Sequence, residues 1–174
     1  KIRLHLLADQ PTPEAMRQAA KEAVAEGFTA IKFDPLLDGY QDMTQDQMIK
    51  SVCEIVAAAR EGGGAELDLI AEVHRKLTPM NSIALAEALT EYNLYFIEDP
   101  IQIDSVISQA EMAKRINIPI GNGERLTTIW EFRELLEHGG PQYVRPDVAL
   151  AGGLSHCKKI AAIAESYHSA VVTH

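Results

Sequence analysis

The stretch Phe96-Ile97-Glu98-Asp99-Pro100 is a short apolar run that ends in a glutamate. Two other runs end in the same way, one in Ala71-Glu72-Val73-His74 and one in Gly121-Asn122-Gly123-Glu124-Arg125. Around them, short apolar runs alternate with amphipathic stretches from one end of the sequence to the other. Alternating strand and helix units of this size predict an α/β fold with a parallel sheet.

The alternation predicts seven strands and six intervening helices, without a linker or low-complexity segment. Thr12 is the expected N-cap of the first helix, Pro13 its first residue, and Gly27 its end. The expected strands cover residues 2–7, 30–33, 67–73, 94–97, 119–121, 143–145 and 170–173. The later helices are expected at 44–60, 81–92, 105–116, 127–137 and 153–167.

Two architectures contain such units, the doubly wound open sheet and the (β/α)₈ (TIM) barrel. A nucleotide-binding open sheet needs a glycine-rich loop after its first strand, but Ala8-Asp9-Gln10-Pro11 contains no glycine. The barrel explains why polar residues gather at the ends of several strands, because those ends meet at one mouth. At 174 residues the chain is short for a barrel, typically about 250 residues. We therefore expect 1–174 to be a single barrel domain and a fragment, covering roughly the first through seventh strands.

Composition narrows the possible partners. The 47% hydrophobic and 24% charged residues are ordinary for a globular domain, and the net charge of −9 argues against a basic nucleic-acid surface. The sequence has no apolar run long enough for a membrane span and no signal-peptide layout. Cys53 and Cys157 stand far apart in no metal-binding or redox spacing, as expected for free thiols in a reducing cytoplasm. We expect no nucleic-acid partner, no membrane partner and a cytoplasmic location.

The three strand-end glutamates are evenly spaced. Glu72, Glu98 and Glu124 follow one another at intervals of 98 − 72 = 26 and 124 − 98 = 26 residues, one βα unit each. Equivalent places on neighbouring barrel strands lie side by side, so the three carboxylates should face a common point. Unpaired, they would repel one another, whereas a hard divalent cation such as Mg²⁺ or Mn²⁺ would remove the conflict. The alternative is that each glutamate is separately solvated or salt-bridged at the start of a loop.

Two histidines stand near the same predicted mouth. His74 lies two residues beyond Glu72, so along an extended strand it would point the same way. His174 follows Asp147 by 174 − 147 = 27 residues, again one unit, which would bring carboxylate and imidazole together. Such a pair fixes the tautomer and raises the basicity of the other ring nitrogen. Lone histidines are more often structural, but this placement favours a catalytic function.

With these residues in place, the sequence resembles the enolase superfamily, and within it the mandelate racemase-like subgroup. The resemblance is closest to acid-sugar dehydratases of the galactonate dehydratase type, and it extends over essentially the whole chain. It rests on four motifs: Glu72-Val73-His74, Ile97-Glu98-Asp99-Pro100, the segment 119–125, and Arg145-Pro146-Asp147 followed by Ala151-Gly152-Gly153-Leu154.

The resemblance implies a Mg²⁺-dependent hydro-lyase that acts on a small acid sugar. In that chemistry a base removes the proton α to the carboxylate, a metal-stabilised enediolate forms, and the 3-hydroxyl leaves to give a 2-keto-3-deoxy sugar acid. By position, His174 supported by Asp147 would be the base, and His74 the acid that protonates the leaving hydroxyl. The residues implied as metal ligands are Glu72, Glu98 and Glu124.

The remaining implied residues are less specific. Arg125 and Arg145 would bind substrate, although a salt-bridge function inside the barrel is an equal alternative. Lys32 is either a substrate contact or a charge partner. The usual first ligand is aspartate, so Glu72 departs from the pattern by one methylene. A capping domain and an eighth strand are also implied but absent from this sequence, so we expect the fragment to be inactive alone. We also expect the complete enzyme to be a homo-oligomer.

Two other functions remain open. A racemase or epimerase of a 2-hydroxy acid in the same superfamily needs two bases that flank the α-carbon, and His74 and His174 could supply them. A catalytically silent barrel, kept for assembly or ligand binding, is the second alternative. Three glutamates together with two histidines argue against the silent barrel, because a binding module does not need all five.

Overall fold

The computed structural model describes residues 3–138 and 140–174. Its strands form one seven-stranded sheet in the order β1-β2-β3-β4-β5-β6-β7, and every neighbouring pair is parallel. The strands are β1 (Leu6–Leu7), β2 (Ala30–Phe33), β3 (Asp68–Glu72), β4 (Phe96–Glu98), β5 (Ile120–Asn122), β6 (Tyr143–Val144) and β7 (Ala170–Val171). This sequential, parallel order confirms the predicted α/β fold and the incomplete barrel.

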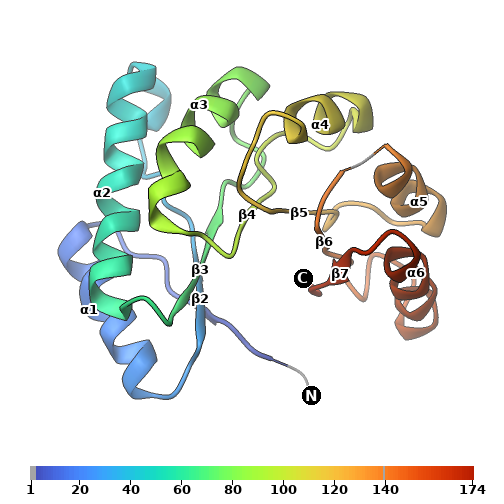
Figure 1. The fold of residues 1–174 in the computed structure, drawn as a ribbon, viewed down its shortest axis with the longest axis horizontal. Helices are drawn as coiled ribbons and strands as arrows, with labels where there is room; N and C mark the ends of the chain where they lie inside the picture. The colour runs from blue at the N-terminus through green and yellow to red at the C-terminus, as the bar shows by residue number, and fades with distance from the viewer. Residues whose placement is uncertain (1–2, 139) are drawn as a thin grey trace.

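Helices connect the strands and lie outside the curled sheet (Figure 1). They are α1 (Pro13–Ala25), α2 (Gln45–Gly63), α3 (Pro79–Leu89), α4 (Val106–Ala113), α5 (Ile129–Glu137) and α6 (Leu154–Ser166), with short 3₁₀ turns at Tyr40–Asp42 and Thr90–Tyr92. In the described part of the chain, none of these helices is long and apolar enough to cross a bilayer. The sequence predicted each helix, with ends that differ by up to three residues.

Hydroxyl side chains fix the start of most helices. Thr12 accepts a hydrogen bond from the backbone N–H of Ala15 and Pro13 opens α1, as the sequence predicted. In α2 the Thr44 side chain and the Gln47 side chain cap each other's backbone N–H. Comparable N-caps stand before three further helices: Thr78, Ser105 and Thr128. Each of these caps stands directly before its helix, so it fixes where the preceding βα loop ends.

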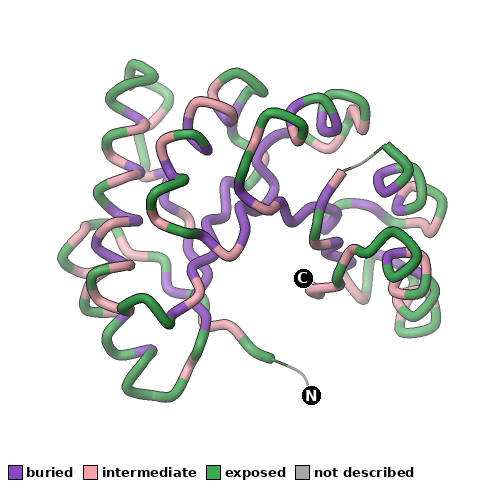
Figure 2. The backbone as a smooth tube through the Cα atoms, viewed as in Figure 1, coloured by how far each residue is buried: buried purple, intermediate pink, exposed green. Residues whose placement is uncertain are grey.

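The sheet is covered on its outer face by the apolar sides of the helices. All four residues of β2 are buried, and Figure 2 shows β2 to β5 at the buried centre of the molecule, whereas β1 and β7 are partly exposed. One large apolar cluster joins β2–β5 to α1–α4, and a smaller one joins β6 to α5 and α6. The burial of β2, β3 and β4 explains the short, nearly continuous apolar runs that the sequence has at these strands.

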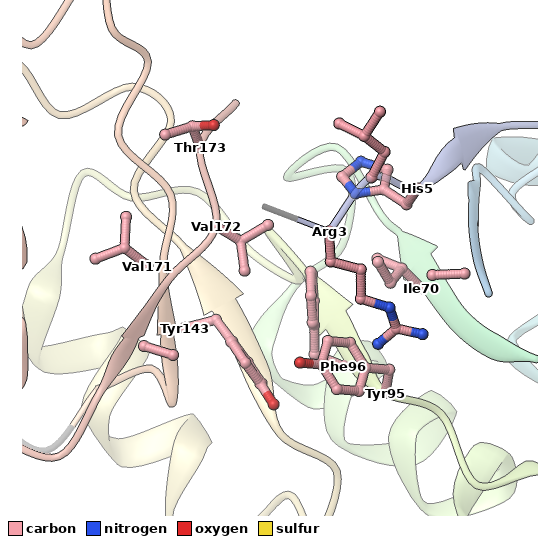
Figure 3. Close-up of a pocket in the computed structure, with 12 residues that line it drawn as sticks. Arg3, His5, Ile70, Tyr95, Phe96, Tyr143, Val171, Val172 and Thr173 are labelled. Atoms are coloured by element: carbon pink, nitrogen blue, oxygen red, sulfur yellow. The ribbon is translucent and has the colours of Figure 1, made fainter. Parts of the chain in front are cut away.

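The inner face carries aromatic rings towards the amino-terminal ends of the strands. The Tyr143 ring centroid lies 4.9 Å from that of Phe96 and 5.1 Å from that of Tyr95. These rings line a cavity of about 660 Å³ that also reaches Arg3, His5 and the β7 segment (Figure 3). Ile70 and Phe96 in this lining stand two residues before Glu72 and Glu98. The cavity is therefore the layer of the barrel interior below the glutamates.

Candidate metal and catalytic site

The three predicted glutamates meet at the carboxyl ends of the strands. Glu72 ends β3 and Glu98 ends β4, and the two residues are direct partners in the parallel register. All three glutamates, including Glu124, are buried, and one oxygen of each lies within 4.8 Å of the others. The structure thus brings the carboxylates to a common point.

Glu124 reaches this point by a different route from the one expected. The partner of Glu98 on β5 is Gly121, so the expectation that all three glutamates stand in equal register was wrong. The strand ends at Asn122, and Gly123 then turns the chain with φ +122°, in the region that favours glycine. A Cβ on Gly123 would lie 2.7 Å from Phe132 Cε1. This turn returns Glu124 to the level of the other two carboxylates.

One oxygen of each glutamate contacts a lysine or arginine side chain, and the other oxygen accepts no hydrogen bond from the described residues. Lys32 Nζ donates to Glu72 Oε2 at 2.5 Å and to Glu98 Oε1 at 3.2 Å. Arg145 Nε lies 2.6 Å from the same Glu98 oxygen, and Arg75 pairs with Glu124 Oε1. Within the described residues, the second oxygens, Glu72 Oε1, Glu98 Oε2 and Glu124 Oε2, are buried and accept no hydrogen bond.

Burial changes the protonation of this cluster. It raises the pKa of Glu98 to about 7, a rise that the Arg145 charge opposes and the Glu72 charge supports. Burial also raises the pKa of the neighbouring Asp99 to about 6, with the Glu124 charge adding to the rise and Arg75 opposing it. Two carboxyls in the cluster therefore hold protons at pH values where ordinary carboxyls are ionised.

Buried carboxylate oxygens without donors are the feature that a hard cation would satisfy. The donor set is three carboxylates, which suits Mg²⁺ or Mn²⁺ rather than a thiophilic metal. Lys32, Arg75 and Arg145 face the opposite oxygens, so they orient the carboxylates without occupying the free ones. The residues present therefore fit a divalent cation held by Glu72, Glu98 and Glu124.

His74 lies beside Glu72, but not on an extended strand. Its φ of +52° is left-handed, so the premise that His74 continues the strand direction of Glu72 was wrong. The side chain nevertheless returns to the site, with Nε2 3.4 Å from Glu72 Oε1. Its other nitrogen, Nδ1, lies 2.8 Å from Asp34 Oδ2.

His174 and Asp147 form the second histidine–aspartate pair. Nδ1 of His174 lies 3.1 Å from Asp147 Oδ2, and Nε2 lies 3.2 Å from Glu124 Oε2. A hydrogen bond from the Leu150 backbone, and then the contact with His174, lower the pKa of Asp147. The aspartate therefore faces the ring as a carboxylate over the neutral pH range.

The three residues suggested for substrate binding lie in different environments. Lys32 and Arg145 are buried within the carboxylate cluster. Arg145 also donates to the Val172 carbonyl at 3.4 Å, and its guanidinium carbon lies 5.9 Å from the Phe96 ring centroid. Arg125 is exposed, and no ion pair of the described residues joins it to the cluster.

Arg75, Asp99 and Asp34 belong to the site although sequence reasoning did not select them. Arg75 pairs with both Asp99 and Glu124. Asp34 Oδ2 contacts His74 Nδ1, and it accepts a hydrogen bond from the Lys76 ammonium at 2.6 Å. Their positions in the sequence could have identified them. Asp34 directly follows β2, Arg75 directly follows His74, and Asp99 directly follows Glu98.

Comparison with known proteins places these features in a family. A family model described as "Enolase C-terminal domain-like" matches residues 15–174. A D-gluconate/D-galactonate dehydratase of Picrophilus torridus is 32% identical over 162 residues, 93% of this chain and 41% of its own length. A D-gluconate dehydratase of Thermoproteus tenax is 29% identical over 93% of this chain and 32% of its own length.

A solved structure agrees with the fold. A mandelate racemase/muconate lactonizing enzyme from Jannaschia sp. superposes with a TM-score of 0.91 at 32% identity, over 99% of this chain and 48% of that one. The chain therefore spans between about a third and a half of the length of the proteins it matches.

Proposed function

Since the chain belongs to the enolase C-terminal domain-like family, we propose that residues 1–174 form one barrel domain of a divalent-metal-dependent acid-sugar dehydratase. The proposal rests on one observation: three buried glutamate oxygens accept no hydrogen bond from the described residues, and two histidine–aspartate pairs flank them. The similarity to gluconate and galactonate dehydratases supports the substrate class. The two free thiols, Cys53 and Cys157, support a reducing, cytoplasmic setting.

Glu72, Glu98 and Glu124 would hold the cation, with Mg²⁺ as the first choice and Mn²⁺ as the second. When bound, such a cation supplies positive charge that stabilises the carboxylate of the substrate as its α-proton is lost. Lys32 and Arg145 hold the outer oxygens of Glu72 and Glu98, so they keep the inner oxygens directed to one point. Their contribution to substrate binding is therefore indirect, through the geometry of the ligands.

His174 is the proposed base. Asp147 accepts from Nδ1, which leaves Nε2 as the nitrogen that faces the cluster, 3.2 Å from Glu124 Oε2. Removal of the α-proton by Nε2 leaves an electron pair that spreads over the substrate carboxylate. His74 is the proposed acid, because its Nε2 faces the cluster beside Glu72, at the other end of the glutamate set.

A racemase or epimerase is the second candidate, because the same two pairs also suit proton exchange from two sides. The two functions give different products. In the complete enzyme with Mg²⁺, a dehydratase converts acid sugars such as gluconate or galactonate into 2-keto acids, whereas an epimerase returns inverted substrate. If the complete enzyme forms neither product from an acid-sugar library and binds no stoichiometric metal, that result would support a silent barrel. We also propose a homo-oligomer, which light scattering of the complete protein would test.

A further inference from the structure

The environment of His74 repeats that of His174. In each pair, Nδ1 of the ring contacts an aspartate Oδ2, at 2.8 Å for Asp34 and 3.1 Å for Asp147. In each aspartate, Oδ1 accepts from a backbone N–H a few residues later, Leu36 at 2.9 Å and Leu150 at 2.8 Å. The aspartates therefore present one fixed oxygen to the ring.

The other ring nitrogen of each histidine, Nε2, lies close to a carboxylate oxygen of a proposed metal ligand. Nε2 of His74 lies 3.4 Å from Glu72 Oε1, and Nε2 of His174 lies 3.2 Å from Glu124 Oε2. Both of these oxygens are among the buried ones without a hydrogen bond. The two rings thus reach the cluster from different ends, each with Nε2 inward and Nδ1 on a carboxylate.

Asp34 is held more firmly than the ring it contacts. Its side chain is 15% exposed against 41% for His74, and its backbone N–H donates to Asp9 Oδ1 at 2.7 Å. His74 itself stands at a left-handed φ of +52° in the loop after β3, where the backbone alone does not fix the ring. The ring orientation therefore depends on the carboxylate.

From these contacts we propose that Asp34 is a positioning residue for the elimination step, and this inference rests on the proposed dehydratase function. Asp34 accepts a hydrogen bond from Nδ1–H of His74, so Nε2 is the nitrogen that gains and loses a proton, and the doubly protonated ring gives its Nε2 proton to the leaving hydroxyl. The step is balanced as follows: the electron pair left by the α-proton forms the C2–C3 double bond, the C3–O bond breaks, and the Nε2 proton leaves with the hydroxyl as water. The enol product then tautomerises to the 2-keto-3-deoxy acid.

Lys76 provides a matched control. Its ammonium lies 2.6 Å from Asp34 Oδ2, the same oxygen that His74 contacts. If Asp34 served only to hold the Lys76 loop, removing the lysine would be as harmful as removing the aspartate. Lys76→Met leaves the His74–Asp34 contact in place, so it separates the two explanations.

The first test measures two reactions of the complete Mg²⁺-loaded enzyme: keto acid formation and exchange of the substrate α-proton with D₂O. Asp34→Asn should slow keto acid formation by about 10² or more, because an amide no longer enforces the tautomer. Proton exchange should stay at the wild-type rate, which also shows that the variant is folded and binds metal. Lys76→Met should behave as wild type in both reactions. Equal losses of exchange and elimination in Asp34→Asn, or a loss of elimination in Lys76→Met, would overturn the assignment.

A substrate that needs no acid gives the second test. In a 3-deoxy-3-fluoro acid sugar, fluoride leaves with the electron pair of the C3–F bond and does not need a proton. Asp34→Asn and His74→Asn should therefore both form keto acid from the fluoro compound at the wild-type rate. A general structural fault would slow the fluoro substrate as much as the hydroxy substrate, and that result would contradict a positioning function.

A spectroscopic readout on the wild-type protein does not depend on any variant folding. The ¹⁵N signals of the neutral His74 ring should show Nδ1 protonated and Nε2 free, with the signals assigned by their loss in His74→Asn. A neutral ring with its proton on Nε2 and none on Nδ1 would refute the inference. If wild-type enzyme forms no keto acid from any acid sugar, the dehydratase function fails; if wild type is active and Asp34→Asn matches it, only the inference fails.

Discussion

Glu98 has the most enclosed carboxylate of the three glutamates, since it is the partner of both Lys32 and Arg145 and is fully buried. We expect Glu98→Gln to weaken Mg²⁺ binding by at least about 10- to 100-fold, because even outer partners of metal ligands are worth that much. The amide also leaves Lys32 and Arg145 with less negative charge. Isothermal titration with Mg²⁺ on the variant and the wild type measures the difference, and wild-type affinity in Glu98→Gln would disprove the ligand assignment.

Protons and metal should compete for the same site. The folded-state pKa of Glu98, about 7, exceeds its ordinary value of 4.5, so between these pH values the folded metal-free chain binds more protons than the unfolded chain. The contribution of Glu98 to stability is therefore present at low pH and lost as the pH rises through about 7, by about 1.4 kcal/mol per unit of pKa shift at most. The raised pKa of Asp99 acts in the same direction.

The measurement is thermal unfolding of the metal-free chain across this range, with and without saturating Mg²⁺. We expect the melting temperature without metal to fall as the pH rises from about 5 to about 7, and saturating Mg²⁺ to remove that fall. Apparent Mg²⁺ affinity should rise over the same interval, because binding then displaces fewer protons. A metal affinity that is independent of pH here would contradict a protonated Glu98.

Asp147 is expected to act on the His174 ring and not on the metal, since its Oδ2 contacts Nδ1 at 3.1 Å while Glu124 lies on the side of Nε2. Asp147→Asn should keep Mg²⁺ affinity near the wild-type value and lower turnover by about 10² to 10⁴, the range of general acid–base assistance. The acidic limb of the pH–rate profile, on which the base His174 loses its proton, should also shift. Weakened Mg²⁺ binding with an unshifted profile would assign Asp147 to the metal instead.

At the scale of elements, the turn after β5 decides whether Glu124 reaches the site. Gly123→Ala places a side chain at φ +122° and within 2.7 Å of Phe132 Cε1. Gly27→Ala is the matched control, because Gly27 has a φ of +89° with open space around its Cβ position. Both variants should lose about 1 kcal/mol or more of stability from the backbone conformation.

Only Gly123→Ala should also change metal binding, because only there does the turn carry a ligand. A displacement of about 1 Å is enough to loosen a preorganised site, so we expect at least about a tenfold loss of Mg²⁺ affinity. Chemical denaturation gives the stability of each variant and titration gives its affinity. Equal affinities in the two alanine variants would show that Glu124 does not depend on the turn.

The same turn explains what sequence could and could not predict. Alternating runs and N-caps such as Thr12 identified the elements, because these signals are local. Register is not local: equal spacing suggested that Glu124 matched Glu98, whereas Gly121 does. Likewise Asp34 and Arg75 were missed because their partners, His74 and Glu124, are distant in sequence. Patterns along the chain locate the strand ends, but pairing across the sheet determines which side chains meet.

At the scale of the whole molecule, the site joins the two apolar clusters. Glu72 and Glu98 end strands that belong to the larger cluster, whereas Asp147 and His174 flank β6 and β7 beside the smaller one. Glu124 lies between them, held by Arg75 from one side and close to His174 on the other. A cation on the three carboxylates would therefore tie both halves of the curled sheet together.

His74 and His174 reach the cluster from these two halves. The order in which they would act gives a prediction for the complete enzyme. In the proposed dehydratase mechanism the α-proton is lost before the hydroxyl leaves, so the two steps can be separated. His74→Asn should lose most dehydration, by about 10² to 10⁴, yet still exchange the substrate α-proton with D₂O. His174→Asn should lose both reactions, since no enediolate forms. The measurements are ¹H NMR for exchange and a keto acid assay for dehydration.

An epimerase predicts a different pattern with the same reagents. In D₂O, native enzyme would return deuterated substrate of inverted configuration and no keto acid, and each histidine variant would still exchange the proton of one stereoisomer. The equivalent Nδ1–aspartate contacts of the two rings allow either pattern, so the product decides. If native enzyme inverts every acid sugar that it exchanges and forms no keto acid, the dehydratase proposal falls and the epimerase takes its place.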